Sequence, residues 1–253
     1  ANLDNFNYSE AEVPLNERPE IDRWVLSELN TLVQKVDTFY AEYEPTKATR
    51  AISDFVQDHL SNWYVRLCRR RFWKGEYSQD KISAYQTLYT NLDVLARLMA
   101  SVAPFFSDFL FKSLNKATGK SDVESVHLSD FPKGNQALIN KDVEERMDMA
   151  KNITSMVLSI RAKDKLKVRQ PLQRILIPVD GAEMQAKIEK VESYILSEVN
   201  VKRMEYVSGT EGIVKKQIKD TVQKINDLNF EGCGEEECSF CQGVYLKEED
   251  LEE

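Results

Sequence analysis

One stretch constrains the fold of this chain more than any other: DFVQDHLSNWYVRLCRRRFWK, residues 54–74, which contains no glycine or proline. It carries five basic and five aromatic side chains. At 100° per residue, one side of the predicted helix is apolar and can enter a core, at Val56, Leu60, Trp63, Tyr64 and Leu67. The opposite side carries an amide, guanidinium groups and an indole, at Asn62, Arg66, Arg69 and Trp73. The stretch therefore predicts a helix with one buried face and one exposed, cationic face.

Arginine and aromatic side chains on one exposed face suit nucleic acid as a partner. Guanidinium groups pair with phosphates and base edges, and flat rings stack on unpaired bases. The alternative is a solvated face whose charges only keep the helix in solution, as on most charged helices. The residue pattern leaves both interpretations open for the candidate set Asn62, Arg66, Arg69, Arg70 and Trp73.

The net charge of −8 at pH 7 argues against a polyanionic partner only until its distribution is considered. Residues 231–253 contain nine acidic side chains and one basic one, which accounts for the whole imbalance. By contrast, residues 44–74 contain seven bases and three acids, and residues 151–174 contain seven bases and one acid. Because the local field rather than the net charge steers a polyanion to a surface, the sequence permits RNA binding without requiring it.

The first half of the chain shows helical periodicity. Nine glycines and seven prolines in 253 residues favour helices over a turn-rich β fold. Apolar residues recurring at three and four predict helices over 20–44, 46–75, 78–103 and 104–115. Pro45 and Pro104 mark boundaries because proline lacks an N–H donor, and Ser78 is a typical N-cap. Four amphipathic helices with short joints predict an antiparallel helical bundle.

After residue 119 the pattern changes. Residues 119–135 are polar and interrupted by glycine and proline, with a patch at Ser125–Leu128 that we expect to be extended. We then predict a helix over 140–161 and strands at 166–170 and 174–179, followed by a helix over 182–197, a strand at 201–207 and a polar helix over 212–228. This half reads as a small α+β module whose sheet is covered by one or two helices.

The expected fold is therefore mainly α. We divide it into a lead-in (1–19), a helical bundle (20–118), a linker (119–139), a small α+β module (140–210) and a helix with an acidic, cysteine-containing tail (211–253). No apolar run reaches the roughly 18–20 residues that span a bilayer, and the first ten residues lack the features of a signal peptide. We expect a cytoplasmic protein without a membrane partner.

The cysteines and histidines offer little chemistry. Cys68 stands alone in the long helix, where a small buried side chain is more typical than a nucleophile. Three cysteines form a C-x4-C-x2-C pattern at Cys233, Cys238 and Cys241, one ligand short of a closed zinc site and without a following histidine. We expect no metal there, with zinc as the open alternative. His59 is expected to pack in the core and His127 to be a solvated loop residue.

Three runs closely resemble the anticodon-binding domain of the isoleucyl-tRNA synthetase family: NERPEIDRWVLSELNTL (16–32), YEPTKATRAISDFVQDHLSNWYVRLCRRRFWKGE (43–76) and DKISAYQTLY (80–89). Two more, RAKDKLKVRQPLQRILIP (161–178) and EVNVKRMEYV (198–207), resemble the module that follows that domain. The resemblance covers about residues 10–216. Valyl and leucyl relatives share the bundle plan, but the KVRQPL run points to the isoleucine family.

The resemblance implies a C-terminal part of a synthetase. The family's catalytic core uses an HIGH-type histidine pair and a KMSKS-type loop with ATP and Mg²⁺, and neither motif occurs in this chain. The part is thus expected to hold no cofactor, to catalyse nothing alone, and to bind isoleucine tRNA rather than DNA, as a monomer. The resemblance gives the tail no role.

In that role, Asn62, Arg66, Arg69, Arg70 and Trp73 are expected to contact the anticodon stem-loop. A predicted strand at 166–170 would add a second cationic surface, with Lys165, Lys167 and Arg169 on one face. Two alternatives stay open. The arginine-rich helix can instead pack against the catalytic core, with Arg71 and Trp73 in a domain interface, or the bundle can be a protein-interaction module with a docking aromatic stripe.

Overall fold

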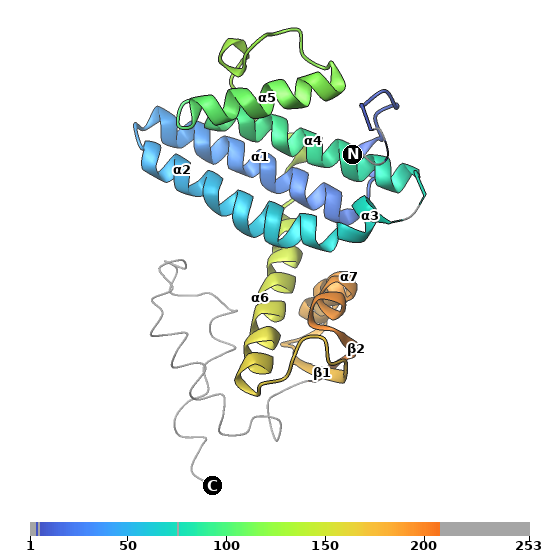
Figure 1. Ribbon diagram of the computed structural model, residues 1–253. Helices are drawn as coiled ribbons and strands as arrows, with labels where there is room; N and C mark the ends of the chain where they lie inside the picture. The colour runs from blue at the N-terminus through green and yellow to red at the C-terminus, as the bar shows by residue number, and fades with distance from the viewer. Residues whose placement is uncertain (1–3, 5, 75, 208–253) are drawn as a thin grey trace. The chain divides into compact units, whose positions relative to one another are not determined.

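The computed structural model of the protein describes residues 4, 6–74 and 76–207 (Figure 1). Contacts divide the chain into two compact units, residues 1–151 and 152–253, so that the boundary falls inside one helix, α6 (Lys141–Lys163).

The first unit is a bundle built on α1 (Glu20–Ala41), α2 (Pro45–Asp54), α4 (Gln79–Met99) and α5 (Pro104–Thr118). Consecutive helices run in opposite directions, with α1 packed on both α2 and α4, and α5 on α4 (Figure 1). Large side chains of α1 fill the core, and Trp24, Val25 and Val36 have no exposed surface. The predicted antiparallel bundle is confirmed.

Local chemistry sets the helix ends. The predicted N-cap is present: the Ser78 hydroxyl accepts a hydrogen bond from the backbone N–H of Lys81 at 3.5 Å. Pro45 and Pro104 occupy the first turns of α2 and α5, where the missing N–H costs nothing. Gly119 ends α5 at φ +62°, a left-handed conformation that a side chain would disfavour.

Between α2 and the short helix α3 (Arg69–Trp73), residues Phe55–Val65 form a π-helical segment, η2. Its wider turns change which side chains are buried relative to an α-helical wheel. Phe55 and Leu60, five residues apart, enter the core, whereas Val56 is only partly covered. The path predicted as one helix over 46–75 is therefore helical as far as Trp73, with a π-helical middle and a turn at Cys68.

The lead-in is irregular, as expected, apart from a 3-10 turn, η1 (Leu15–Glu17). It packs on α4 through the buried side chain of Arg18. The Arg18 guanidinium donates to the Val13 carbonyl and the Thr87 hydroxyl, both at 2.9 Å.

The segment that we expected to act as a linker, 119–139, packs on the bundle. Its patch Ser125–Leu128 is not extended, so that prediction is wrong: Val126–Leu128 form a 3-10 turn, η3. The carboxylate of Asp108 accepts from the Ser125 hydroxyl at 2.7 Å and from the Val126 N–H at 3.2 Å. These bonds turn the backbone and bury Val126 against Phe111. A second 3-10 turn, η4 (Gln136–Leu138), contacts α1.

In the second unit, β1 (Leu172–Pro178) and β2 (Val201–Val207) pair in parallel, with α7 (Ala182–Val199) as the connection between them. Leu172 pairs with Val201 and Pro178 with Val207. Residues at helical spacing on α7 are fully buried, namely Ile188, Val191, Ile195 and Val199. The predicted small α+β module is confirmed, and within residues 152–207 it has two strands rather than three.

The strand predicted at 166–170 does not form. Buried Arg161 donates to the carbonyl oxygens of Lys167 and Gln170, at 2.6 and 2.5 Å. The Asn200 amide donates to the Val168 carbonyl at 2.9 Å. Since these acceptors are held by side chains, the segment folds as a turn instead of adding to the sheet.

Among the described residues, no helix is both long and apolar enough to span a membrane.

Candidate nucleic-acid interface

The five bundle residues selected from the sequence lie on the outside of η2 and α3. Asn62, Arg66, Arg69, Arg70 and Trp73 are all exposed, and the indole of Trp73 is 70% exposed. The apolar side of the same path is covered, as Trp63 and Tyr64 show. We call these five residues the cationic-aromatic face. The predicted division of this helix into a core side and an exposed side is confirmed.

Arg71 anchors this face to the bundle from behind. Its guanidinium pairs with both carboxylate oxygens of buried Asp22 on α1, at 2.6 and 2.9 Å. It also binds Asp80, at 2.9 Å, and the Ser83 hydroxyl, at 3.0 Å, both on α4. Burial alone would lower the pKa of Arg71, but the hydrogen bonds and charge of Asp22 outweigh it and raise that pKa. Arg71 therefore fixes α3 between α1 and α4.

Tyr64 completes the anchor. Its hydroxyl donates to Asp22 at 3.0 Å, and burial together with the Asp22 charge raises the pKa of Tyr64. Asp22 thus accepts from a guanidinium, a phenol and a hydroxyl (Ser83) at once. A buried carboxylate with this many donors is held rigidly, because the protein donors already occupy both of its oxygens and exclude water. We call Asp22, Arg71, Tyr64 and Ser83 the junction.

Arg69 and Trp73 form a preorganised pair on the outer surface. The guanidinium carbon of Arg69 lies 4.9 Å from the centre of the Trp73 ring, within the range of a cation–π contact. Next to them, Arg70 and Lys74 line a shallow hollow of about 390 Å³ together with Arg71, Glu76, Ser78, Asp80 and Lys81. The surface thus offers an exposed indole beside cationic groups, a combination that fits a phosphate backbone and an unstacked base.

The structure places the second predicted surface on a turn. Lys167 and Arg169 are exposed, as are Lys163 and Lys165. Because 166–170 is not a strand, the expected alternation of faces is wrong, and Lys165 has a φ of +56°. The bases remain accessible on the turn that follows α6.

The remaining described candidates, Cys68, His59 and His127, take the places that the sequence predicted for them. Cys68 is buried, and burial raises the pKa of its thiol to about 12, which removes it as a nucleophile at neutral pH. His59 stacks on Phe55 with a ring separation of 5.7 Å, in agreement with the expected packing role. His127 is exposed on η3, as predicted. Cys233, Cys238 and Cys241, like the helix predicted over 212–228, lie outside the described residues.

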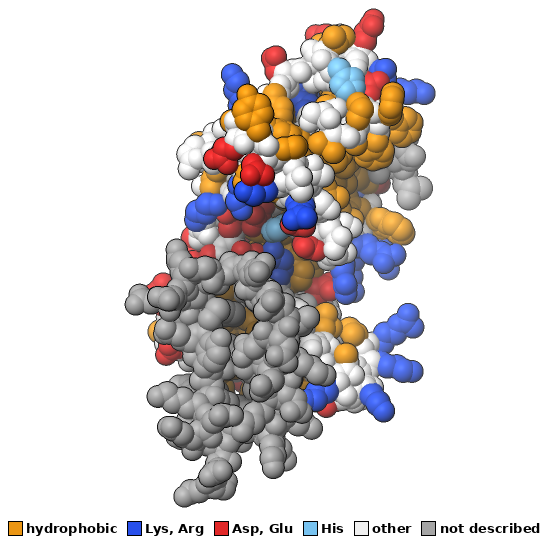
Figure 2. All heavy atoms as spheres, turned by 90° about the vertical axis from the view of Figure 1, so that its left-hand side faces the viewer, with side chains coloured by type: hydrophobic (Ala, Val, Ile, Leu, Met, Phe, Trp, Pro, Cys, Tyr) orange, Lys and Arg blue, Asp and Glu red, His pale blue; other side chains and the backbone are white. Residues whose placement is uncertain are grey.

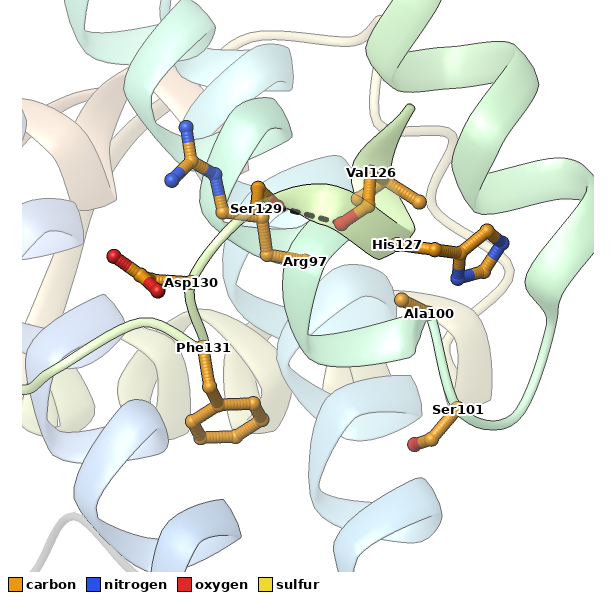
Figure 3. A pocket seen from close by; sticks show the side chains of 8 residues that line it. All are labelled: Arg97, Ala100, Ser101, Val126, His127, Ser129, Asp130 and Phe131. Carbon is orange, nitrogen blue, oxygen red and sulfur yellow. Dashed lines mark hydrogen bonds between the residues drawn. The ribbon is translucent and has the colours of Figure 1, made fainter. Parts of the chain in front are cut away.

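A second hollow, of about 260 Å³, lies at the other end of α4 (Figure 3). Arg97 and Asp130 lie on one side of it and His127 on the other, while the Ser129 hydroxyl donates to the Val126 carbonyl at 2.6 Å. Arg97 is paired with Asp93 on the next turn. The lining includes no paired base and nucleophile of the kind that covalent catalysis needs.

Sequence reasoning missed an exposed apolar surface on α5. Phe105 is 90%, Phe106 57% and Phe109 69% exposed, whereas Ser107 of the same helix is buried. Figure 2 shows hydrophobic side chains gathered on this end of the bundle. The signal was present in the spacing, since Phe105 and Phe109 lie on the side of the helix opposite Ser107 and Phe111. Exposed apolar patches of this kind mark contact surfaces.

Comparison with known proteins agrees with this geometry. Residues 22–176 match the family described as the anticodon-binding domain of tRNA ligase. The isoleucine–tRNA ligase of Bacteroides thetaiotaomicron is 57% identical over 225 residues, which cover 89% of this chain and 19% of that protein. That of Cytophaga hutchinsonii is 56% identical, over 89% of this chain and 20% of the relative. That of Thermus thermophilus is 35% identical, over 86% and 21%.

The bundle is thus a helical domain with a buried apolar core and an exposed cationic-aromatic face. With residues 22–176 matched, the chain belongs to the anticodon-binding domain family of tRNA ligases. It spans about a fifth of the length of the curated relatives that it matches.

Proposed function

We propose that this chain is the part of an isoleucine–tRNA ligase that binds the anticodon stem-loop of isoleucine tRNA. The observation that carries the proposal is the cationic-aromatic face. The five side chains that the sequence predicts to contact RNA are exposed together on a domain of the anticodon-binding family. The name shared by the similar proteins, isoleucine–tRNA ligase, supports isoleucine tRNA as the partner.

Each residue of the face has a separate role in this proposal. Arg66, Arg69 and Arg70 neutralise phosphates of the loop and release counterions. Trp73, held from one side by Arg69, stacks on an unpaired base. Asn62 hydrogen-bonds a base edge, because an amide supplies both a donor and an acceptor. The junction at Arg71 keeps these groups in place without touching RNA.

Lys167 and Arg169 form a second cationic contact in the proposal. Both side chains are exposed on the turn held by Arg161, so they can approach a backbone phosphate without unfolding the second unit. Their contribution is electrostatic and independent of base identity.

The rest of the activity belongs to the longer protein. We infer that its catalytic core carries out ATP-dependent aminoacylation with Mg²⁺ in the cytoplasm, and that this part acts as a monomer without a catalytic cofactor of its own. This sequence contains no HIGH or KMSKS motif, which supports the assignment of catalysis to another part of the longer protein. The alternative of a protein-docking aromatic stripe is not favoured on this helix, since Trp63, Tyr64 and Phe72 are buried.

A filter-binding titration tests the proposal. The full chain is titrated against isoleucine tRNA and against a tRNA with another anticodon, each at low and moderate salt. We expect tighter binding of isoleucine tRNA and weaker binding of both at the higher salt. Equal affinity for the two tRNAs, salt-independent binding or undetectable binding would overturn it.

A further inference from the structure

A cluster of metal-ligating side chains lies inside the first unit, away from the residues proposed to bind RNA. Glu28 on α1, His59 on η2 and Asp148 on α6 each bring one ligand atom to within 4.8 Å of the others. The Glu28 carboxylate and the His59 Nε2 atom are 3.9 Å apart. The three residues are 31 to 120 positions apart in the sequence, so only the fold brings them together.

We propose that Glu28, His59 and Asp148 bind a divalent transition-metal ion, with Zn²⁺ as the best fit, and that the ion ties the first half of α6 to α1 and η2. One imidazole nitrogen and two carboxylate oxygens are a ligand set that zinc accepts, with water at the remaining position. Calcium and magnesium prefer oxygen ligands alone, so the imidazole argues against them.

The geometry requires only small movements. Ligand atoms at 2.0–2.1 Å from a tetrahedral zinc ion are roughly 3.3 Å apart. Separations of 3.9 to 4.8 Å therefore close by rotations of the carboxylate groups. The Asp148 side chain is 54% exposed and forms an ion pair with Lys151, whereas those of Glu28 and His59 are 12% and 23% exposed and are held by the core.

Neighbouring side chains orient two of the ligands. The indole N–H of Trp24 donates to a Glu28 carboxylate oxygen at 3.2 Å, the type of outer contact that fixes metal-binding carboxylates. The His59 ring lies between two aromatic rings, stacked on Phe55 at 5.7 Å and tilted against Trp24 at 5.9 Å. The imidazole plane is therefore set before any ion arrives.

Two carboxylates and one imidazole face one another in the cluster, and the ammonium of Lys151 lies beside them. Lys151 offers partial compensation, with its ammonium 2.7 Å from an Asp148 oxygen. The same ammonium competes with an incoming ion for Asp148.

The test uses the full chain with the three tail cysteines changed to serine (Cys233→Ser, Cys238→Ser, Cys241→Ser), so that thiolates of the tail do not bind the added metal. Zn²⁺ is titrated calorimetrically at pH 8, above the ordinary pKa values of imidazole and carboxyl groups. Co²⁺ is added in parallel, since a thiolate ligand would show itself by a charge-transfer band. We expect one ion per chain and a Co²⁺ spectrum without thiolate character.

Three substitutions decide the ligands. His59→Phe keeps a flat ring for the aromatic stack but removes the nitrogen, and we expect the affinity for Zn²⁺ to fall at least about tenfold. Glu28→Gln should do the same without changing shape, and decides the question if His59→Phe does not fold. Lys151→Met removes the competing ammonium and should tighten binding. The matched control His127→Phe, in an exposed loop, should leave the affinity unchanged.

The proposal is overturned if the serine-substituted chain binds no stoichiometric Zn²⁺ at pH 8. It is also overturned if Glu28→Gln and His59→Phe, both folded, bind as tightly as His127→Phe. Binding of tRNA is not used as a readout, so the outcome is independent of the proposed function.

Discussion

Replacement of Asp22 by asparagine should loosen the junction that positions the cationic-aromatic face. Asp22 has no exposed surface and accepts from Arg71, Tyr64 and Ser83. Asp22→Asn removes the negative charge and points an amide N–H₂ at groups that are themselves donors. Arg71 then keeps only Asp80 as a charged partner, on a carboxylate that is 51% exposed.

The magnitude follows from the burial of the pair. Removing one partner of a buried ion pair costs about 3–5 kcal/mol. Because the Arg71 side chain is 17% exposed and keeps Asp80, we expect the lower end, about 3 kcal/mol. For a unit of this size, that lowers the melting temperature by about 6–12 °C. Thermal and urea unfolding followed by circular dichroism measure it.

Two comparisons make this prediction specific. Asp37→Asn, on an exposed carboxylate of the same helix, should change stability by no more than about 0.5 kcal/mol. Adding Arg71→Met to Asp22→Asn should cost less than the sum of the single changes, since the unpaired guanidinium is then gone. If Asp22→Asn melts within about 2 °C of the unaltered chain, the junction does not hold α3 as described.

Three further predictions follow from single residues. Trp73→Ala should weaken tRNA binding by roughly 1–3 kcal/mol in a filter-binding titration, and Trp73→Phe by less, because a smaller ring still stacks; equal losses would argue against stacking. Cys68 should resist a thiol reagent, followed by mass spectrometry, until denaturant exposes it, and modification in the native chain would contradict its burial. In metal-free buffer, the raised pKa of Glu28 means that folding takes up a proton between about pH 4.5 and 7, so the stability that Glu28 contributes should be full below about pH 4.5 and be lost as the pH rises through about 7. Glu28→Gln should then be more stable than the unaltered chain at pH 8, by up to about 3 kcal/mol, and similar at about pH 4, and a loss of stability at pH 8 would refute the assignment.

The helices of the bundle could be predicted because their signals are local. Proline at the start of α2 and α5, serine before α4 and glycine after α5 act through their own backbone geometry. The exposed side of η2 and α3 could be predicted too, since a face with several arginines has no place in a core. Both kinds of inference need only neighbouring residues.

The wrong predictions come from hydrogen bonds with side chains outside the predicted segment, and in one case from a change of helical pitch. The alternating segment at 166–170 resembles a strand, but Arg161 and Asn200 donate to its carbonyl groups. Ser125–Leu128 looks extended until Asp108, 17 residues earlier, turns it. The π-helical pitch of η2 moved burial from Val56 to Phe55, which a fixed 100° wheel does not represent. Glu28, His59 and Asp148 carry no periodic signal as a group.

The central claim is that the cationic-aromatic face holds RNA through its phosphates, and salt dependence tests it most directly. The slope of log affinity against log salt is compared for the unaltered chain and for a triple variant, Arg66→Ala, Arg69→Ala and Arg70→Ala. A matched triple variant removes exposed lysines elsewhere on the bundle: Lys35→Ala, Lys116→Ala and Lys133→Ala.

Each phosphate contact contributes about 0.7–0.9 to that slope, so losing three should make it shallower by about 2. Raising the salt from about 50 to 200 mM should then weaken the unaltered chain roughly 20- to 40-fold more than the arginine variant. The lysine variant should keep the original slope. Identical slopes for the unaltered chain and the arginine variant would contradict the claim and move the RNA contact to another surface.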